Sequence, residues 1–362
     1  MKILYLMHIN WFWIRQRPQV IAEILAQRHS VRLLHYAMYR SQHRAGERSP
    51  PMPSQLVYRV PGPLKRASDL FEWLDLWWIE QQVLSAYKRT KPDCVWVLHP
   101  IYERATRRLG TCPVVYDCMD DHLEFIGQGT ERLAQAERRL VARADLCVFS
   151  SATLAQRVNQ RSPSRRQIVV NNAVSQRFME LAQQASAEAK APPRSSAKLN
   201  APTFGYFGTI SHWFDWALVM RLLQAMPQAR LQLVGPLETP VPQHERIEHL
   251  GVLAHADLVG FAQGCDILLM PFVVNRLIES VDPVKLYEYI ALGVPSLAPR
   301  YAESERFEPF ISLYRNHDEA LALVKALLQR PPQPRAGALQ FLTHNTWEAR
   351  GAQLFEQLDA LA

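Results

Sequence analysis

The chain has 362 residues, 48% of them hydrophobic and 21% charged, and this length and composition predict a globular protein with two domains. It contains no run of eighteen apolar residues, so we expect no helix that spans a membrane. The net charge of +7 is unevenly distributed: residues 1–200 contain 29 Lys and Arg against 17 Asp and Glu (+12), and the other 162 residues contain 12 against 17 (−5).

The basic first half predicts an anionic partner. Its arginines are dispersed and accompany no helix-turn-helix, zinc-finger or aromatic RNA-binding pattern, which argues against nucleic acid and favours an anionic membrane surface. Five cysteines, an odd number without the spacing of metal ligands, indicate reduced thiols and no metal site. The first residues read as a strand, and no small-residue cleavage site follows them. We therefore expect a cytoplasmic protein, peripheral at the inner face of the membrane.

The first predicted elements form a strand–helix–strand unit. A buried strand at 2–9 precedes a helix at 16–26, with Pro18 in its first turn, and a second strand at 30–36. The loop after the first strand is expected at the edge of a parallel sheet where ligands bind. The unit lacks Gly-x-Gly-x-x-Gly, which argues against a dehydrogenase that binds a nicotinamide or a flavin.

The next region contains one long helix after a proline-rich loop. Residues 41–66 are polar and predict a loop with one strand at 55–60. Residues 70–91 have apolar side chains at helical spacing. Such a stripe is usually a core face, but three Trp residues near basic side chains also suit a helix that lies at a lipid interface. Both interpretations stay open.

Three carboxylates follow the next pair of predicted strands, at 94–98 and 113–116. Asp117, Asp120 and Asp121 stand at the carboxyl end of the second strand and are the acid–base candidates of the first half. The alternative is structural, with Asp120 or Asp121 capping the following helix. The remaining elements expected in this half are a helix at 130–144, a strand at 146–150, a helix from 151 and a strand at 167–170.

The second half follows an Ala-, Gln-, Ser- and Pro-rich stretch, 181–202, which reads as a linker or a weak helix. Strand 203–207 then runs into Gly208 and Thr209, where glycine lets the backbone approach a ligand and the turn offers backbone donors to a phosphate. Further elements are expected as helices at 212–226, 255–264 and 347–361 and as strands at 230–234, 249–253, 265–272 and 294–298.

Residues 280–295 predict a short helix with a phosphate-binding start. Ser280 or Asp282 is suited to cap it, Pro283 suits its first position, and a left-handed glycine, Gly293, suits its end. Lys285 and Glu288 are three residues apart and share a face, which places a cation and a hydrogen-bond acceptor beside the free N–H groups. A diphosphate with its ribose requires such a pair. The alternative is a surface helix with one intrahelical ion pair.

The segment from Pro283 to Pro295 resembles the Pro-x-Lys-x-x-Glu-Tyr-x-Ala-x-Gly-x-Pro signature of GT-B glycosyltransferases, especially family-4-like enzymes of bacterial surface polysaccharide synthesis of the teichuronic-acid type. The resemblance implies that Glu288 binds the ribose of a nucleotide sugar and that Lys285 neutralises its diphosphate during catalysis. The family often has a second Glu at the place of Ser280. We include Ser280 among the donor-site residues because it stands at this position, although it departs from the family pattern. The Arg and Lys that usually follow the glycine loop are absent, which leaves Lys285 and Arg276.

The resemblance extends to the first half. Residues 11–19 look like the subgroup's N-terminal motif, and Tyr116 to Asp120 matches its Tyr-Asp-x-x-Asp, which favours a role in the cleft. Arg15 and Arg17 are expected to contact phosphate, or to be surface residues at a helix start. The residues assigned to the acceptor side are His8, Trp11, Trp13, Arg15 and Arg17.

Together these patterns predict an α/β protein with two Rossmann-like doubly wound domains facing a cleft. We expect an acceptor-binding domain at 1–172, a linker at 173–202, a nucleotide-sugar-binding domain at 203–345 and a helix at 346–362 that packs back on the first domain. The expected function is transfer of a sugar from a nucleotide sugar to a glycan or lipid-linked acceptor, with retention and without metal or cofactor. If the configuration inverts, one of the three Asp acts as the base. The alternatives are a sugar-nucleotide epimerase and a non-catalytic scaffold subunit.

Overall fold

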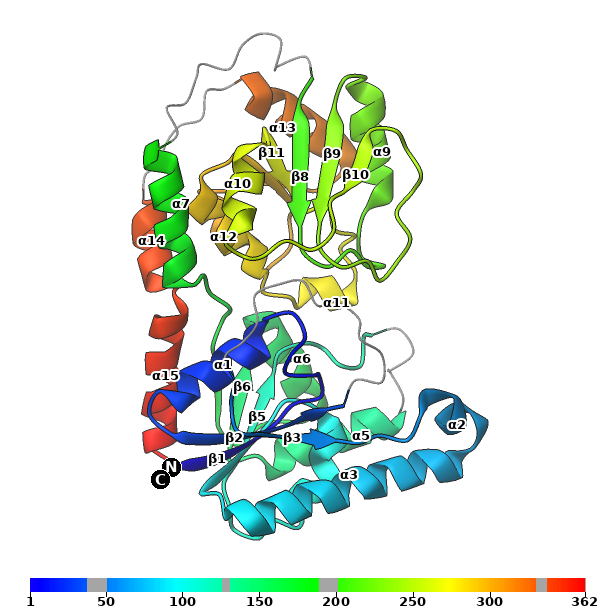
Figure 1. Cartoon of the computed structure of the whole chain (residues 1–362), viewed down its shortest axis with the longest axis vertical. Helices are drawn as coiled ribbons and strands as arrows, with labels where there is room; N and C mark the ends of the chain where they lie inside the picture. Colours follow the sequence, from blue (N-terminus) through cyan, green and yellow to red (C-terminus); the bar gives the residue numbers. More distant parts are fainter. Residues whose placement is uncertain (38–50, 126–130, 189–200, 330–336, 362) are drawn as a thin grey trace. The chain divides into compact units, whose positions relative to one another are not determined.

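The computed structural model describes residues 1–37, 51–125, 131–188, 201–329 and 337–361. The chain forms two compact units (Figure 1). The first contains the described residues before Asn172 together with those from Arg350 onward, and the second contains the described residues from Asn172 to Ala349. Among the helices that the structure describes, none has both the length and the apolar character required to cross a membrane.

The first unit is built on a parallel sheet of seven strands in the order β3-β2-β1-β4-β5-β6-β7. Its central strands β4, β5 and β6 are buried along their whole length, as expected for a parallel sheet covered on both faces. The strands are β1 (Lys2–Leu6), β2 (Ser30–Tyr36), β3 (Ser54–Val57), β4 (Cys94–Val97), β5 (Val114–Cys118), β6 (Leu146–Phe149) and β7 (Gln167–Val169).

The helices of the first unit connect successive strands. Pro18 lies in the first turn of α1, as predicted, and its carbonyl accepts a hydrogen bond from the Tyr5 hydroxyl (2.9 Å), which ties the helix start to β1. The helices are α1 (Arg17–Ala26), α2 (Gly62–Ala67), α3 (Asp69–Thr90), the 3₁₀ turn η1 (Pro100–Tyr102), α4 (Glu103–Thr106), α5 (Glu131–Arg143), α6 (Ala152–Arg161) and the part of α15 (Trp347–Asp359) that follows Ala349.

The second unit repeats this design with a parallel sheet of six strands in the order β10-β9-β8-β11-β12-β13. The strands are β8 (Thr203–Phe207), β9 (Arg230–Val234), β10 (Ile247–His249), β11 (Ile267–Leu269), β12 (Ser296–Pro299) and β13 (Ser312–Tyr314). The helices are α7 (Gln176–Glu188), α9 (Trp216–Ala225), α10 (Asp257–Gln263), α11 (Arg276–Glu279), α12 (Val284–Leu292), η2 (Glu305–Phe307), α13 (His317–Gln329) and α14 (Ala338–His344).

In both sheets the strand order reverses beside the first strand of the unit. β1 lies between β2 and β4, and β8 lies between β9 and β11. Open parallel sheets bind ligands at the carboxyl ends of the strands on either side of such a reversal. The fold therefore marks one candidate binding edge in each unit, and the predicted doubly wound class is confirmed.

Two segments differ from their predicted form. Residues 176–188 form the helix α7, which starts before the stretch read as a linker or a weak helix and is a core helix, because Phe178, Met179 and Ala182 pack into the second unit. The strand expected at 249–253 is β10, which ends at His249, because Gly251 takes a positive φ of 79° and its carbonyl accepts from Gly235. Much of the predicted loop at 41–66 lies outside the described residues, and its described end contains β3 and α2.

Candidate functional site

The glycine turn after β8 is built by close contact between three parts of the second unit. Gly208 has a φ of +130°, and a Cβ there would lie 2.1 Å from Cε and 2.6 Å from Nζ of Lys285. Gly235, at the end of β9, has a φ of +135°, and a Cβ there would lie 2.1 Å from the carbonyl oxygen of Gly208. Both positions thus require glycine for conformation and for space. The turn predicted from Gly208 is confirmed, whereas its contact with Gly235 was not predicted.

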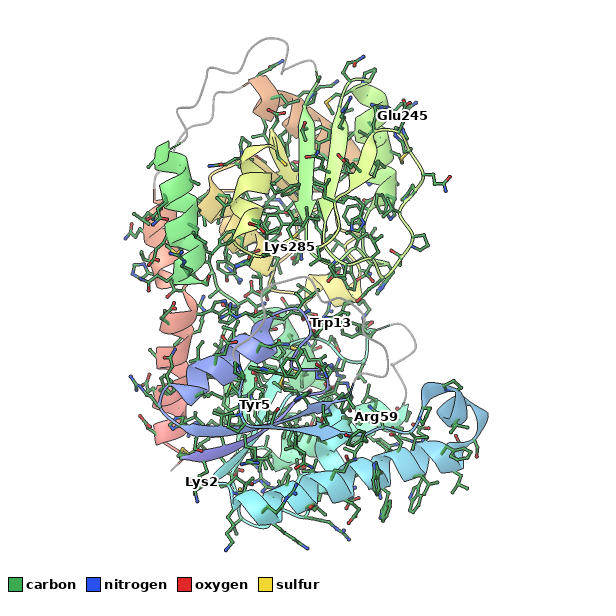
Figure 2. All side chains as sticks on the ribbon, in the orientation of Figure 1. Lys2, Tyr5, Trp13, Arg59, Glu245 and Lys285 are labelled. Atoms are coloured by element: carbon green, nitrogen blue, oxygen red, sulfur yellow. The ribbon has the colours of Figure 1, made fainter. Side chains whose placement is uncertain are left out.

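Lys285, labelled in Figure 2, brings a cation to this turn. It is half-buried, and its Nζ lies 5.6 Å from the ring centroids of both Tyr206 and Phe272. Burial lowers the pKa of Lys285, and the nearby Glu288 carboxylate acts in the opposite direction. Within the described parts of the chain, Nζ has no hydrogen bond or ion pair. The ammonium is therefore positioned to gain an anionic ligand.

Glu288 lies one turn further along α12, but its partner is not Lys285. Its Oε1 is 2.7 Å from Nε2 of His255, and its side chain is 12% exposed. The His255 ring stacks on Phe178 of α7, with centroids 4.4 Å apart and an interplanar angle of 26°. His255 precedes α10 and is oriented by two other helices, so no local sequence signal identifies it. The intrahelical ion pair that we considered is not formed.

The start of α12 differs from the prediction. Pro283 is the residue before the helix, and no side chain caps the first turn. A separate short helix, α11, precedes α12. Ser280 is the residue that follows the last turn of α11, and its hydroxyl donates to the carbonyl of Leu277 (2.8 Å). Asp282 instead accepts from the backbone N–H of Asn172 (2.5 Å) and pairs with Arg306. Gly293 has a φ of +68° at the helix end, which confirms that part of the prediction.

The other donor-site candidates lie around this core with different exposure. Thr209 is half-buried, and its carbonyl accepts from the Tyr206 hydroxyl (2.7 Å), which holds the turn in place. Arg276 is exposed at the first position of α11. Ser280 is buried, and its hydroxyl proton is already used by the Leu277 carbonyl. Gly208 and Lys285 are therefore in direct contact, and Thr209 is the next residue of the same turn.

In the first unit, Asp117 and Arg17 form an internal ion pair. Oδ1 of Asp117 is 3.1 Å from Nη2 of Arg17, and Oδ2 accepts from Nε1 of Trp96 (3.3 Å). Nη1 of Arg17 donates to the carbonyl of Val170 (2.7 Å), and both charged side chains are buried. This arrangement differs from the phosphate contact expected of Arg17 and the acid–base role expected of Asp117, because the two side chains are already paired with each other inside the unit.

The two remaining aspartates have contrasting surroundings. Asp121 is fully buried and pairs with Arg161 (2.9 Å), which also pairs with Glu137 (2.9 Å), so it is held in a structural network. Asp120 is partly exposed, and its side chain forms no hydrogen bond with the residues described. Burial raises the pKa of Asp120 to about 6, against the lowering effect of Arg17. A carboxyl group with such a pKa suits proton transfer near neutral pH, so Asp120 is the acid–base candidate that the structure favours.

The aromatic and basic residues after β1 are more enclosed than expected. Trp11 is fully buried, which contradicts the expected contact with an acceptor, because a core side chain cannot reach a ligand. Trp13 is half-buried and is labelled in Figure 2. Arg15 pairs with Glu23 of α1 (2.8 Å) and keeps about a quarter of its side chain exposed. Trp13 and Arg15 thus remain the accessible members of this group.

Three histidines meet at the carboxyl edge of the first sheet. His8, His99 and His122 follow β1, β4 and β5, and their ring centroids are 4.7 Å (8 to 99), 4.4 Å (99 to 122) and 5.7 Å (8 to 122) apart. Nδ1 of His99 accepts from the N–H of Ile101 (3.1 Å), whereas Nδ1 of His8 and Nε2 of His122 have no hydrogen-bond partner in the part of the chain that the structure describes. We name these three residues the histidine cluster.

Burial keeps the histidine cluster neutral. It lowers the pKa of His8 to about 3 and that of His122 to about 4, and it places the pKa of His99 well below its usual value. No group of three or more His, Cys, Asp or Glu in the described ranges has the arrangement of a metal site. Only His8 was selected from the sequence. The position of each histidine just after a buried strand is the signal that identifies the other two.

The chain has two doubly wound units. In the second unit a lysine contacts a glycine turn at the point where the order of the strands reverses. These features define the two-domain class of GT-B proteins. Comparison with known proteins agrees. Residues 14–173 match the family model described as a glycosyl transferase 4-like domain, and residues 217–356 match the model described as glycosyl transferase-like. The chain therefore belongs to the family-4-like glycosyltransferases, a class of transferase enzymes.

Individual relatives are distant in sequence. TuaH of Bacillus subtilis (strain 168), a glycosyltransferase named for teichuronic acid biosynthesis, is 23% identical over 252 residues. That match covers 64% of this chain and 62% of the relative, so it spans less than two thirds of TuaH. Among solved structures, sucrose-phosphate synthase from Thermosynechococcus elongatus has a TM-score of 0.73 at 13% identity over 100% of both chains. Anabaena HepE, in complex with UDP and glucose, has a TM-score of 0.69 at 15% identity over 99% of both. These two structures show the shared fold.

Proposed function

We propose that this chain transfers a sugar from a nucleotide sugar to a glycan or lipid-linked acceptor in cell-surface polysaccharide synthesis, with retention of configuration and without a metal ion. The observation that carries the proposal is the Lys285 ammonium, held against Gly208 at the carboxyl end of β8 with no anionic partner among the residues that the structure describes. The complexes of HepE with UDP and with UDP-glucose support a nucleotide sugar as donor, and the name of TuaH supports the pathway class.

On the donor side, the second unit supplies charge stabilisation. When the bond from the anomeric carbon to the diphosphate breaks, negative charge grows on the departing nucleoside diphosphate. Lys285 and the backbone N–H groups at Gly208 and Thr209 are proposed to stabilise that charge, because fixed donors are most effective where charge develops. Glu288, oriented by His255, is proposed to accept hydrogen bonds from the ribose hydroxyls.

On the acceptor side, the first unit supplies groups for a hydroxyl. Within the described segments, the Asp120 carboxyl group, with a pKa of about 6, has no hydrogen-bond partner, and the histidine cluster adds neutral ring nitrogens that also have none. We assign the orientation and deprotonation of the acceptor hydroxyl to these residues. Retention requires no protein nucleophile in this scheme. If the product shows inversion, Asp120 becomes the base of a single displacement, so the anomeric configuration of the product decides between the two courses.

The test is a donor panel with matched variants. Purified protein is incubated with UDP-, GDP- and dTDP-sugars, and release of the nucleoside diphosphate and formation of product are measured. We expect one donor to be used, and Lys285→Ala and Glu288→Gln to reduce kcat/KM by at least about tenfold, since each removes one charged contact. Lys325→Ala and Glu245→Gln are the matched controls, because both side chains are exposed, and Glu245 lies away from Lys285 on the second unit (Figure 2).

The outcomes separate the candidate roles. Loss in both site variants with unchanged controls supports the proposed donor site. Nucleotide-sugar binding without turnover, restored only by a partner protein, supports the non-catalytic subunit, which the Ser280 departure permits. Absence of both binding and turnover over the whole panel contradicts the proposal.

A further inference from the structure

The outer face of α3 in the first unit exposes an unusual set of apolar side chains. Seven of the fifteen exposed large hydrophobic residues in the described chain lie between Leu56 and Trp78. They include three of the chain's nine Trp residues, all within two turns of α3. We define the aromatic patch as the α3 residues Leu70 (61% exposed), Trp73 (50%), Trp77 (39%) and Trp78 (46%) with Leu64 of α2 (44%).

Helix geometry places these residues opposite the buried face of α3. The buried positions of the helix are Asp75, Ile79, Val83 and Ala86, which follow one another at three- and four-residue spacing, together with Glu80. Leu70 and Trp77 are half a turn away from that row, and Trp73 and Trp78 flank them. Further along the same outer face the helix carries Gln81 and Lys88. The apolar surface is thus confined to the N-terminal half of α3.

Two of the acidic side chains in this half of the helix are already paired, whereas Asp69 is exposed in its first turn. Asp75 accepts from Arg59 and from the backbone N–H of Val60 (2.8 Å), and Glu72 pairs with Arg132. Basic side chains surround the helix: Lys88 and Arg89 occupy its last turn, and the largely exposed Arg108, which follows α4, pairs with Glu80 (3.2 Å). This distribution agrees with the net charge of +12 on residues 1–200. It favours an anionic lipid surface over an acidic protein surface as the partner of the aromatic patch.

The aromatic patch also lies on the same side of its unit as the histidine cluster. Arg59 follows β3 and joins Asp75 of α3, and Figure 2 shows it on the sheet side of that helix. Its charge also acts on His99 and lowers the pKa of that histidine. At the other end of α3, Arg89 bonds Gln55 within β3. The N-terminal half of α3 is therefore the half near the carboxyl edge of the sheet.

We propose that the aromatic patch docks the first unit on an anionic phospholipid bilayer, with α3 in the plane of the interface and the histidine cluster turned toward a lipid-linked acceptor. Indole rings suit this position because their apolar body enters the acyl boundary while the N–H stays among the headgroups. The docking surface rests on the proposed function only for the identity of the acceptor. Lipid binding itself depends on the patch alone.

The test uses the full chain and vesicles of phosphatidylcholine with or without phosphatidylglycerol. We expect flotation with the anionic vesicles and quenching of Trp fluorescence by brominated acyl chains. The triple variant Trp73→Ser, Trp77→Ser, Trp78→Ser should lower the partition coefficient by at least about tenfold, since burial of one large apolar side chain is worth about that factor. The triple Trp→Phe variant should retain much of the binding. Met220→Ser and Leu339→Ser remove exposed apolar residues of the second unit and serve as controls.

Nucleoside diphosphate release without an added acceptor separates the two proposals. If the triple Ser variant keeps the donor reaction and loses vesicle binding, the docking surface is supported; if donor chemistry is absent in every variant while binding follows the patch, only the proposed function fails. Vesicle binding that survives the triple Ser variant overturns the docking surface. A wild type that is dimeric by light scattering, becomes monomeric in that variant and does not bind vesicles also overturns it, because the patch is then an interface between copies.

Discussion

At the scale of single residues, the candidate donor site depends on atoms that are missing as much as on those that are present. Gly208 and Gly235 have no Cβ. The Lys285 side chain lies where a Cβ of residue 208 would be, and the carbonyl of Gly208 lies where a Cβ of residue 235 would be. The pKa of Lys285 is lowered because the ammonium loses water on burial. An anionic ligand is thus favoured for two reasons: it returns a counter-charge, and it does so where water screens little.

This geometry predicts the effect of one added methyl group. Gly208→Ala combines a disfavoured φ of +130° with a contact of 2.1 Å to Lys285, so we expect a loss of about 1–3 kcal/mol in the free energy of unfolding. Displacement of the lysine should also weaken UDP binding by at least about tenfold. Urea unfolding and calorimetry measure the two effects. Gly260→Ala is the control, because nothing lies within 4 Å of its Cβ position. UDP binding at wild-type strength in Gly208→Ala would show that Lys285 moves aside without consequence.

At the scale of elements, helix α7 links the core of the second unit to the ribose-binding candidate. Phe178 and Met179 are both buried on this helix, but only Phe178 stacks on His255, which in turn bonds Glu288. The ring stack restricts the imidazole, and the imidazole restricts the carboxylate. A helix that overlaps the stretch read as a linker or a weak helix is therefore part of the support for the site.

A pair of conservative substitutions on α7 tests this support. Phe178→Leu removes the ring while keeping much of the volume, and it should cost about 1–2 kcal/mol of stability and raise the donor KM with little change in kcat. Met179→Leu changes a buried neighbour of similar size and should leave KM unchanged. Steady-state kinetics with the donor found in the panel give the comparison. Equal increases in KM for both variants would mean that α7 acts through general packing and that the stack has no specific role.

At the scale of the whole first unit, the histidine cluster couples stability to pH. The folded pKa of His122 is about 4 and its unfolded value about 6.5, so between these values the unfolded chain binds the additional proton. The contribution of neutral His122 is complete above pH 6.5 and is lost progressively as the pH falls toward 4. His8, His99 and the positively charged Arg161 all face His122. A proton on His122 is therefore repelled by Arg161, and also by His8 or His99 once either of these is protonated. Asp120 acts in the opposite sense, because its raised pKa favours the folded state as the pH falls below 6.

His122→Gln should therefore flatten this pH dependence. Between pH 7 and pH 5 the free energy of unfolding should fall by about 2 kcal/mol more in the wild type than in the variant. This value follows because pH 5 lies about 1.5 units below the unfolded pKa and each unit is worth about 1.36 kcal/mol. Urea titrations at several pH values, followed through the transition of the first unit, measure the difference. His344→Gln, an exposed position of the second unit, is the control. Parallel pH profiles for wild type and His122→Gln would contradict a buried neutral histidine at this position.

The sequence alone determined the doubly wound class, most of the strands, the glycine turn at 208, the end of α12 at Gly293 and the Lys285–Glu288 motif. These features are local: they follow from apolar periodicity, from positive φ at glycine and from residues a few positions apart. Only the tertiary structure decided that Arg17 pairs with Asp117, that Trp11 is core, that His255 holds Glu288 and that three histidines from separate strand ends meet. Those partners are distant in sequence, and strand order and side-chain packing bring them together; the sequence marks each histidine only as a residue that follows a buried strand.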